Sequence, residues 1–259
     1  MKSLQDKIVV VTGASRGLGL ELARTFAAEG CRVAMAARDQ RTLTDAAKKI
    51  ADSGGQTLPF ACDVTRREEV DDLAQRVMTV WGSAQILINN AGIARAMRFI
   101  DMPDELWHEI LAVNLSGAYH CCKVFLPAMI QYKWGRIINI ASTAAKVGYP
   151  YVSAYTASKH GLIGLTRSLA LETAQLGVTV NAICPGYVDD ERTRENARIM
   201  ADKTGKPLGE IIDLFAASAP QHRLIQPAEV AALAVLIASE QLGAMTGQAI
   251  NVDGGAVMV

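Results

Sequence analysis

The sequence has no excess of charge of either sign and no long hydrophobic run. Its 259 residues include 26 basic and 26 acidic side chains, which balance to a net charge of zero. A balanced chain offers no electrostatic attraction to the phosphates of nucleic acids or to anionic membranes. No window reaches the roughly 18 apolar residues that a membrane helix needs, and the uncharged stretch 173–188 is interrupted by Gln175, Asn181 and Pro185. We therefore expect neither nucleic acid nor a membrane as partner.

Signals for export, disulfide bonding and metal binding are missing as well. Residues 1–7 lack the apolar core of a signal peptide, so we expect a cytoplasmic protein. The five cysteines are an odd number and include no C-x-x-C pair, which fits a reducing compartment. The four histidines show no ligand spacing with one another or with a cysteine, so we expect no bound metal.

Apolar runs of strand length alternate with amphipathic segments of helix length along the chain. Strands are predicted at 7–12, 32–37, 57–61, 85–89, 136–141, 179–183 and 249–252. Helices are predicted at 18–29, 40–52, 66–81, 103–131 in two pieces, 153–175 and 227–239. Apolar strands that are each followed by a helix are typical of a doubly wound α/β fold, a parallel sheet with helices on both faces. Ligands of such sheets bind beyond the carboxyl ends of the strands.

One segment does not fit this alternation. Residues 187–220 are polar and charged and are interrupted by Gly205, Pro207 and Gly209. We predict an insertion that covers the ligand site as a lid. No change of composition, repeat or low-complexity segment marks a linker, so we expect a single domain over 1–259.

A glycine-rich turn, TGASRGLG at 12–19, joins the first predicted strand to the first helix. Glycine lets the backbone approach a ligand closely, and the helix N-terminus that follows attracts phosphate. The spacing G-x-x-x-G-x-G differs from the common G-x-G-x-x-G. The turn is either a plain connection or a dinucleotide site, and its place after the first strand favours the site. The expected cofactor residues in it are Gly13, Ser15, Arg16, Gly17, Leu18 and Gly19.

The end of the second predicted strand bears on which dinucleotide binds. NAD sites place an acidic residue there, which bonds the ribose hydroxyls. Here the strand ends in Ala37 and Arg38, and Arg16 can approach the same place. Two guanidinium groups suit a 2′-phosphate, so we expect NADP(H) in preference to NAD(H). Asp39 opposes this interpretation because it can pair with Arg38, and both arginines can also be solvated loop residues.

A tyrosine and a lysine stand four residues apart in the predicted helix 153–175. Tyr155 and Lys159 therefore share one face of it, although this spacing is common by chance. Ser142, just after the fifth strand, and Asn114, in the long helical region, complete a candidate catalytic set. The alternative interpretation makes these four a core tyrosine, a surface lysine, a strand-end cap and a helix kink.

With these residues in this order, the sequence resembles the short-chain dehydrogenase/reductase family over nearly its whole length. The motifs that carry the resemblance are the glycine turn, Asp63-Val64, Asn89-Asn90-Ala91-Gly92, Asn114, Ser142, Tyr155-x-x-x-Lys159, Pro185-Gly186 and the ending Asn251-Val252-Asp253-Gly254-Gly255. The resemblance implies a Rossmann-type fold and an Asn-Ser-Tyr-Lys catalytic set. Within the family, the sequence looks most like 3-oxoacyl-acyl carrier protein reductases and polyketide ketoreductases.

The resemblance implies oxidoreductase chemistry at a ketone or a secondary alcohol. Hydride transfer from the nicotinamide to a carbonyl carbon leaves negative charge on the oxygen, so a proton must be supplied. By resemblance, Tyr155 exchanges this proton, and Lys159 favours its phenolate and holds the nicotinamide ribose. Ser142 polarises the substrate oxygen, and Asn114 positions a water that links Lys159 to solvent.

The resemblance assigns further cofactor contacts, and one position departs from it. The contacts are Asp63 and Val64 near the adenine, Asn90, Ala91 and Gly92 along the groove, and Pro185, Gly186 and Val188 at the nicotinamide. The family usually has a threonine four residues after the glycine of Pro-Gly. This chain has Asp190 there, and its next threonine is Thr193. Asp190 either accepts from the nicotinamide carboxamide or belongs to a loop that differs.

The expected substrate pocket is mixed and rather apolar. Its lining residues are Ala94, Ala144, Lys146, Tyr149, Val152 and Tyr187. Such a lining suits a ketone or alcohol with apolar bulk, either a small molecule or a group linked to an acyl carrier. Similar 3-hydroxybutyrate dehydrogenases usually carry polar residues where this chain has Ala94, Ala144 and Val152, which argues against that substrate.

Two rival functions remain open from the sequence. One is a NAD-dependent catabolic dehydrogenase of a secondary alcohol, and the other is a dinucleotide-binding protein without catalysis. The intact catalytic set argues against the second. The family also implies a homotetramer, assembled through the helices at 103–131 and 153–175 and through the C-terminal strand.

Overall fold

The computed structural model describes residues 4–259, so residues 1–3 of the N-terminal stretch considered above lie outside it. Seven parallel strands form one sheet with the order β3-β2-β1-β4-β5-β6-β7. The strands are β1 (Ile8–Thr12), β2 (Arg32–Ala37), β3 (Gln56–Ala61), β4 (Ile86–Asn89), β5 (Gly135–Ile140), β6 (Val178–Pro185) and β7 (Ala249–Val252). The predicted doubly wound sheet of about seven strands is thereby confirmed.

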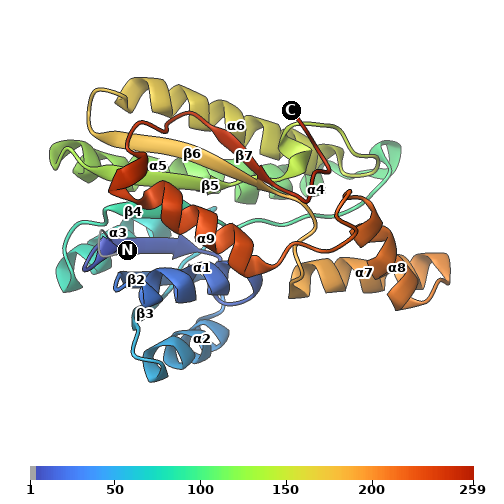
Figure 1. Ribbon diagram of the computed structural model, residues 1–259, viewed down its shortest axis with the longest axis horizontal. Coiled ribbons are helices and arrows are strands. Elements are labelled where there is room, and N and C mark those ends of the chain that lie inside the picture. Colours follow the sequence, from blue (N-terminus) through green and yellow to red (C-terminus); the bar gives the residue numbers. More distant parts are fainter. Residues whose placement is uncertain (1–3) are drawn as a thin grey trace.

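Helices cover both faces of the sheet (Figure 1). One face carries α1 (Gly17–Ala28), α2 (Gln40–Asp52) and α9 (Pro227–Ala238). The other carries α3 (Arg67–Val80), α5 (Gly117–Gln131) and α6 (Ser153–Thr173). Within residues 4–259, none of these helices combines the length and the apolar character that crossing a membrane requires.

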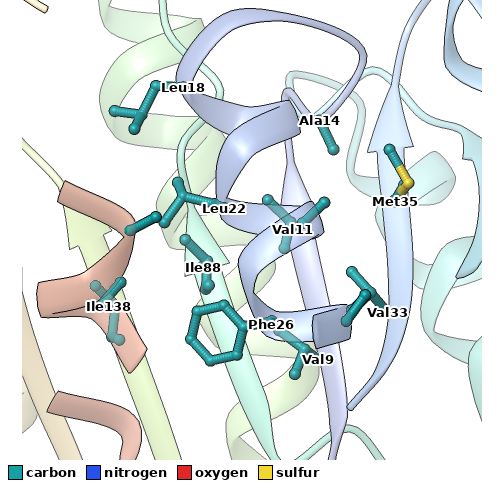
Figure 2. Packing of buried hydrophobic residues seen from close by; sticks show 14 of the residues in the cluster. Val9, Val11, Ala14, Leu18, Leu22, Phe26, Val33, Met35, Ile88 and Ile138 are labelled. Carbon is teal, nitrogen blue, oxygen red and sulfur yellow. The ribbon is translucent and has the colours of Figure 1, made fainter. Parts of the chain in front are cut away.

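Alternate side chains of each strand enter two separate cores. Val9 and Val11 of β1 pack against Leu22 and Phe26 of α1, as Figure 2 shows. Val10, between the two valines, belongs to the core on the opposite face. Because successive side chains of a strand point to opposite faces, a strand covered on both sides is apolar throughout. This is why the strands read as continuous apolar runs.

The long helical region is divided as predicted. It begins with α4 (Asp104–Leu111) and passes into α5 through a π-helical turn, Ala112–Ser116. Asn114 lies in this turn, and its side chain bonds to groups outside the helix. π turns inside helices are frequent at functional sites.

The segment 187–220, in which no helix was predicted, is mostly helical. It contains α7 (Glu191–Thr204) and α8 (Leu208–Ala217). Asp190 caps α7 by accepting a hydrogen bond from the backbone N–H of Thr193 at 3.0 Å, and Gly205 ends the helix at φ 70°. The polar composition of α7 hid that helix, which is exposed over much of its surface, whereas α8 is short and largely apolar. In Figure 1 they extend past the ends of the strands.

The strand order reverses between β1 and β4. From β1 the chain passes outward through β2 to β3, and then returns to place β4 on the other side of β1. Open α/β sheets bind their ligands at such a reversal, beyond the carboxyl ends of the strands. The glycine turn follows β1 and Asn90 follows β4, so both lie at this point.

Candidate active site

Two polar side chains fix the shape of the glycine turn. The hydroxyl oxygen of Thr12 accepts from the backbone N–H groups of Asn90 and Ala91, both at 3.0 Å. The side-chain amide of Asn90 donates to the carbonyl oxygens of Thr12 at 2.9 Å and Gly13 at 3.2 Å. A Cβ atom on Gly19 would collide with the Gly13 carbonyl. The turn is therefore compact, and it requires glycine where the first helix crosses it.

The N-terminus of α1 is free to receive an anion. Its first turn holds no acidic residue, and its N-cap residue Arg16 supplies no acceptor. The free N–H groups and the positive end of the helix dipole both attract phosphate. Leu18 packs in the core (Figure 2), so only its backbone can meet a ligand.

A cleft of about 600 Å³ opens beside this helix end. Its lining consists of Ser15, Arg16, Gly17, Leu20, Asp39, Arg41, Thr42, Asp45, Ala46, Lys49 and Glu191. Three of these side chains are basic, and the glycine turn contributes its backbone. The residues present therefore fit a dinucleotide whose phosphates lie on the turn.

The two arginines predicted to hold an extra phosphate are placed differently. Arg16 lines the cleft and lies 3.9 Å from Glu191 across it. Arg38 is exposed and is not part of the cleft lining. Arg41 of α2 does line the cleft, and sequence reasoning missed it. A basic residue in the first turn of a helix looks like part of an ordinary solvated face, so no pattern distinguished it.

Asp39 does not take the role that would have weakened the NADP(H) expectation. Its carboxylate caps α2 by accepting from the backbone N–H of Thr42 at 2.7 Å. Hydrogen bonding from Thr42 holds the pKa of Asp39 below its usual value. The carboxylate is thus engaged with the start of its own helix.

Lys159 is buried beneath Tyr155. The lysine side chain is 3% exposed, and its ammonium donates to the carbonyl oxygen of Ile140 at 2.7 Å. The ammonium nitrogen lies 5.7 Å from the centre of the Tyr155 ring. Burial lowers the pKa of Lys159 from 10.5 to about 7, and the positive charge of Arg192 adds to this shift. The lysine can therefore gain or lose a proton near neutral pH.

Asn114 ties the π turn to the neighbouring loop and to α6. Its amide oxygen accepts from the backbone N–H of Ile93 at 2.8 Å, and its NH₂ group donates to the Ile93 carbonyl at 2.9 Å. The same NH₂ donates to the Ser158 hydroxyl at 3.0 Å, which itself donates to the Tyr155 carbonyl at 2.7 Å. A Cβ on Gly92 would lie 3.3 Å from the Asn114 oxygen and 3.6 Å from the Lys159 nitrogen. Asn114 thus lies in a distorted helical turn and also beside the lysine.

Ser142 lies at the end of β5, on the side of α6 that carries Tyr155. Its hydroxyl oxygen accepts from the backbone N–H of Ala144 at 3.1 Å and so caps the 3-10 helix Thr143–Ala145. That short helix packs against α6. A hydroxyl that accepts one hydrogen bond keeps its own proton for a second partner. The strand-end cap and a donor to a substrate oxygen are therefore compatible roles for Ser142.

A buried polar ladder behind these residues was not predicted. The Asn89 amide donates to the Asn139 side-chain oxygen at 2.8 Å, and the Asn139 amide donates to the Thr166 hydroxyl at 2.8 Å. The ladder joins β4 and β5 to α6, the helix that carries Tyr155 and Lys159. The available signal was an asparagine inside the apolar run GRIINI, since a buried amide needs partners.

The other predicted cofactor residues follow β3 and β6. The Asp63 carboxylate accepts from the backbone N–H of Thr65 at 2.9 Å, and the carbonyl of the buried Val64 contacts His120 Nδ1 at 2.9 Å. Pro185 ends β6, the Gly186 N–H donates to the Val252 carbonyl at 3.0 Å, and Val188 pairs with Ile225 in an isolated bridge. Asp190 lies where the loop after β6 ends and α7 begins, and it caps this helix as described above.

A second cavity lies beyond the carboxyl end of β6, beside α8. Two of the predicted substrate residues, Tyr149 and Tyr187, line it together with Phe215. Tyr187 stacks on Phe215 with ring centres 4.4 Å apart, and burial raises the pKa of Tyr187. The cavity therefore has an aromatic wall, to which the segment 187–220 contributes Tyr187 and Phe215.

The other four predicted pocket residues lie outside the lining of this cavity. Ala144 is buried beneath it, and Ala94 and Val152 are half-buried in the loop after β4 and just before α6. Lys146 donates to the carbonyl oxygen of Val259 at 2.6 Å. Of the three aromatic residues that line this cavity, Tyr149 and Tyr187 were named from the sequence. Phe215 was missed because no motif marks that residue.

Comparison with known proteins identifies the family. The family profile described as "short chain dehydrogenase" matches residues 7–201. The chain belongs to this family, and the resemblance seen in its motifs is confirmed.

Individual relatives narrow the class of enzyme. The chain is 38% identical over 256 residues to a D-beta-hydroxybutyrate dehydrogenase of Cupriavidus necator, covering 97% of this chain and 98% of that protein. It is 36% identical over 257 residues to a putative ketoacyl reductase of Streptomyces coelicolor, covering 98% of both chains. A crystal structure of an actinorhodin polyketide ketoreductase variant with NADPH superposes with a TM-score of 0.94 at 36% identity over 99% of both chains. The protein is an oxidoreductase that acts on a CH–OH or C=O group with a nicotinamide cofactor.

Proposed function

We propose that this protein is an NADP(H)-dependent reductase of 3-oxoacyl or related ketone substrates, with Tyr155 as the general acid and base. The observation that carries the catalytic part is the burial of Lys159 beneath the Tyr155 ring, fixed by the Ile140 carbonyl. A buried lysine with a pKa near neutrality is typical of a site where protons are transferred. The rival function of dinucleotide binding without catalysis leaves this arrangement unexplained.

Each member of the set has a task in the reaction. The nicotinamide, when bound, supplies or accepts the hydride. The Tyr155 hydroxyl gives a proton to the substrate oxygen, and the Ser142 hydroxyl donates a hydrogen bond to the same oxygen. Lys159 replaces the proton that the Tyr155 hydroxyl has given up. Its pKa of about 7 allows both the charged and the neutral form near neutral pH. Asn114 holds the backbone of Ile93 in place beside Lys159 through two hydrogen bonds.

The preference for NADP(H) rests on the basic side chains at the cleft. Arg16, Arg41 and Lys49 line it beside the acidic Asp39, Asp45 and Glu191, and Arg38 stands exposed at the end of β2. A 2′-phosphate carries two negative charges, which guanidinium groups bind by charge-assisted hydrogen bonds. The similar actinorhodin ketoreductase was crystallised with NADPH, which agrees with this choice.

The proposed substrate class follows from the relatives and from the aromatic cavity. Relatives named ketoacyl reductase and 3-oxoacyl-[acyl-carrier-protein] reductase are 36% identical to this chain. Tyr149, Tyr187 and Phe215 line a space of only about 10 Å³, so a ketone, either free or linked to an acyl carrier, would meet these apolar walls after the rings move apart. The second candidate is a NAD-dependent dehydrogenase of a small hydroxy acid, which the 38% identity to D-beta-hydroxybutyrate dehydrogenase favours.

Three further proposals concern the setting of the site. Residues 1–259 form a single domain in which 187–220 closes over the substrate as a lid, because Glu191 lines the cleft and Phe215 lines the cavity. Exposed apolar side chains on α5 and α6, such as Tyr119 and Leu171, suit burial in a homotetramer. We expect the protein to work in the cytoplasm.

Initial rates with both cofactors and several substrates test the proposal. The panel contains a 3-oxoacyl thioester, a cyclic ketone and 3-hydroxybutyrate, each with the matching reduced or oxidised cofactor. We expect reduction of the ketones with NADPH to be fastest. A clear preference for NAD with 3-hydroxybutyrate would replace the proposal by the second candidate.

The substitution Tyr155→Phe tests the mechanism. It removes one hydroxyl, so we expect kcat for ketone reduction to fall by about 10²–10⁴-fold. The melting temperature serves as the control for folding. Reduction that survives this substitution unchanged would show that another group transfers the proton.

A further inference from the structure

The residue Asp190 places a carboxylate against the phosphate-binding turn. It lies between β6 and α7 and is 7% exposed. One carboxylate oxygen accepts from the Thr193 N–H at 3.0 Å, which caps α7. The other oxygen is directed at the glycine turn, since a Cβ on Gly17 would lie 3.0 Å from it. Gly17 is the first residue of α1, whose free N–H groups attract an anion.

A second carboxylate follows directly in the chain and also meets the glycine turn. Glu191 lines the cleft and lies 3.9 Å from the Arg16 guanidinium. The entrance of α7 therefore meets the start of α1 through two acidic side chains. Both positions are where negatively charged groups of a dinucleotide are favoured.

The capping role alone does not require a charge at Asp190. Asparagine, serine and aspartate cap helices about equally well, because each supplies a side-chain oxygen to the backbone. A buried carboxylate costs more free energy than a neutral cap unless something compensates it. The positive end of α1 lies beside this carboxylate, so the feature that would stabilise a phosphate also favours a negative charge at Asp190.

We propose that Asp190 acts as an internal substitute for a cofactor phosphate. In the empty protein its carboxylate holds α7 against the glycine turn. When the dinucleotide binds, the two anions compete for one helix end, so Asp190 weakens cofactor binding and speeds cofactor release. This inference rests on the proposed function, because it presumes a phosphorylated cofactor on the turn.

The two carboxylates have distinguishable effects. The diphosphate is common to NADPH and NADH, so Asp190 weakens the binding of both to the same extent. Glu191 competes for Arg16, which the proposed function assigns to the 2′-phosphate, so its effect falls on NADPH alone. Because Glu191 and Arg16 are exposed, the Glu191 effect is the smaller one.

The experiment measures the dissociation constants of NADPH and NADH by calorimetry without substrate. Asp190→Asn keeps the cap and removes the charge, so we expect both cofactors to bind about tenfold more tightly. Glu191→Gln should tighten NADPH alone, by about threefold. The control Asp202→Asn removes the same charge from the far end of α7, and we expect no change there beyond about twofold.

The outcomes separate this inference from the proposed function. If the unaltered protein binds neither cofactor, the proposed function fails. If it binds them and Asp190→Asn leaves both constants unchanged, the competition is wrong and the proposed function stands. If Asp190→Asn weakens binding, the carboxylate is a ligand of the cofactor, which also overturns the inference. Asp190→Ser repeats the test with a second neutral cap, and a melting curve confirms that each variant is folded.

Discussion

The catalytic centre and the cofactor rim are built in opposite ways. In the centre, Lys159 and Asn114 are at least 97% buried, and each has a hydrogen-bond partner within 3.0 Å. At the rim, the side chains of Arg16 and Glu191 are 74% and 68% exposed and face each other at 3.9 Å. Exposed pairs of this kind contribute little to stability, whereas buried polar networks hold one geometry.

The difference separates what the protein keeps rigid from what it can readjust. Proton transfer requires groups fixed to within a fraction of an ångström, and a buried network provides this. Recognition of a cofactor phosphate tolerates movement, because long basic side chains follow the charge. Substitutions in the two regions should therefore have different consequences. In the centre, the free energy of unfolding and kcat change together, whereas at the rim only the affinity for the cofactor changes.

The largest effect is expected for Asn114→Ala. It leaves the Ile93 N–H and carbonyl and the Ser158 hydroxyl without their partner, so the free energy of unfolding should fall by about 2–4 kcal/mol. It also disturbs the pocket of Lys159, so kcat should fall by about 100-fold. Chemical denaturation and steady-state kinetics measure the two effects.

Thr166→Val is the matched control for that prediction. It removes a buried hydrogen-bond acceptor of Asn139 that lies on α6, at a cost of about 1–2 kcal/mol. We expect its kcat to stay within about twofold, since the ladder lies behind the reacting groups. If both variants lose activity equally, then activity depends on the packing of this region as a whole and not on Asn114 in particular. The contrast drawn between the catalytic centre and the cofactor rim would then be wrong.

The next effect concerns the stability of Lys159→Met as a function of pH. The pKa of Lys159 falls from 10.5 in the unfolded chain to about 7 in the folded protein. The cost of burying the charge is therefore fully present below pH 7, and it declines as the pH rises to 10.5. At pH 6 the methionine variant should be more stable than the unaltered protein by about 1–3 kcal/mol, although inactive.

Denaturation curves at pH 6, 8 and 10 check this prediction. The gain in the free energy of unfolding should shrink steadily across the series. A gain that stays constant with pH would mean that Lys159 carries the same charge in the folded and the unfolded chain at each pH, and hence that its pKa is not lowered on folding.

The smallest effect is expected at the rim, for Arg16→Ala. It removes one guanidinium from the cleft, so the dissociation constant of NADPH should rise about tenfold and that of NADH by less than twofold. The free energy of unfolding should change by no more than about 0.5 kcal/mol, because the side chain is exposed. Lys48→Ala, a basic residue of α2 outside the cleft lining, is the control.

The sequence predicted most of the fold because its strands are buried on both faces. Strand positions such as 32–37 and 249–252 agree residue for residue with β2 and β7. The helix α7 could not be predicted in the same way, since it is mostly polar and lacks a strong apolar stripe. The helix α8 was missed although Leu208, Ile211, Ile212 and Phe215 have helical spacing. The start of α7 depends on Asp190, whose capping hydrogen bond to Thr193 is visible only in the structure.

The site was predictable to the extent that its chemistry recurs at fixed spacings. Tyr155, Lys159 and Ser142 formed a set in the sequence because they follow particular strands and turns. The positions of Arg41 and Phe215 could not be predicted, because each meets the site only through the packing of separate elements. Contacts between distant segments that carry no motif are visible only in three dimensions.

The π-helical turn at Ala112–Ser116 has a consequence for how this region can change. A π turn contains one residue more than an α-helical turn, and each residue of an α-helix rotates the chain by about 100°. The extra residue therefore sets the rotational phase of α4 relative to α5. Deleting a single residue here would give an unbroken helix, yet it would turn one half against the other and remove Asn114 from Ile93. We therefore expect this turn to accept substitutions far more readily than changes in its length.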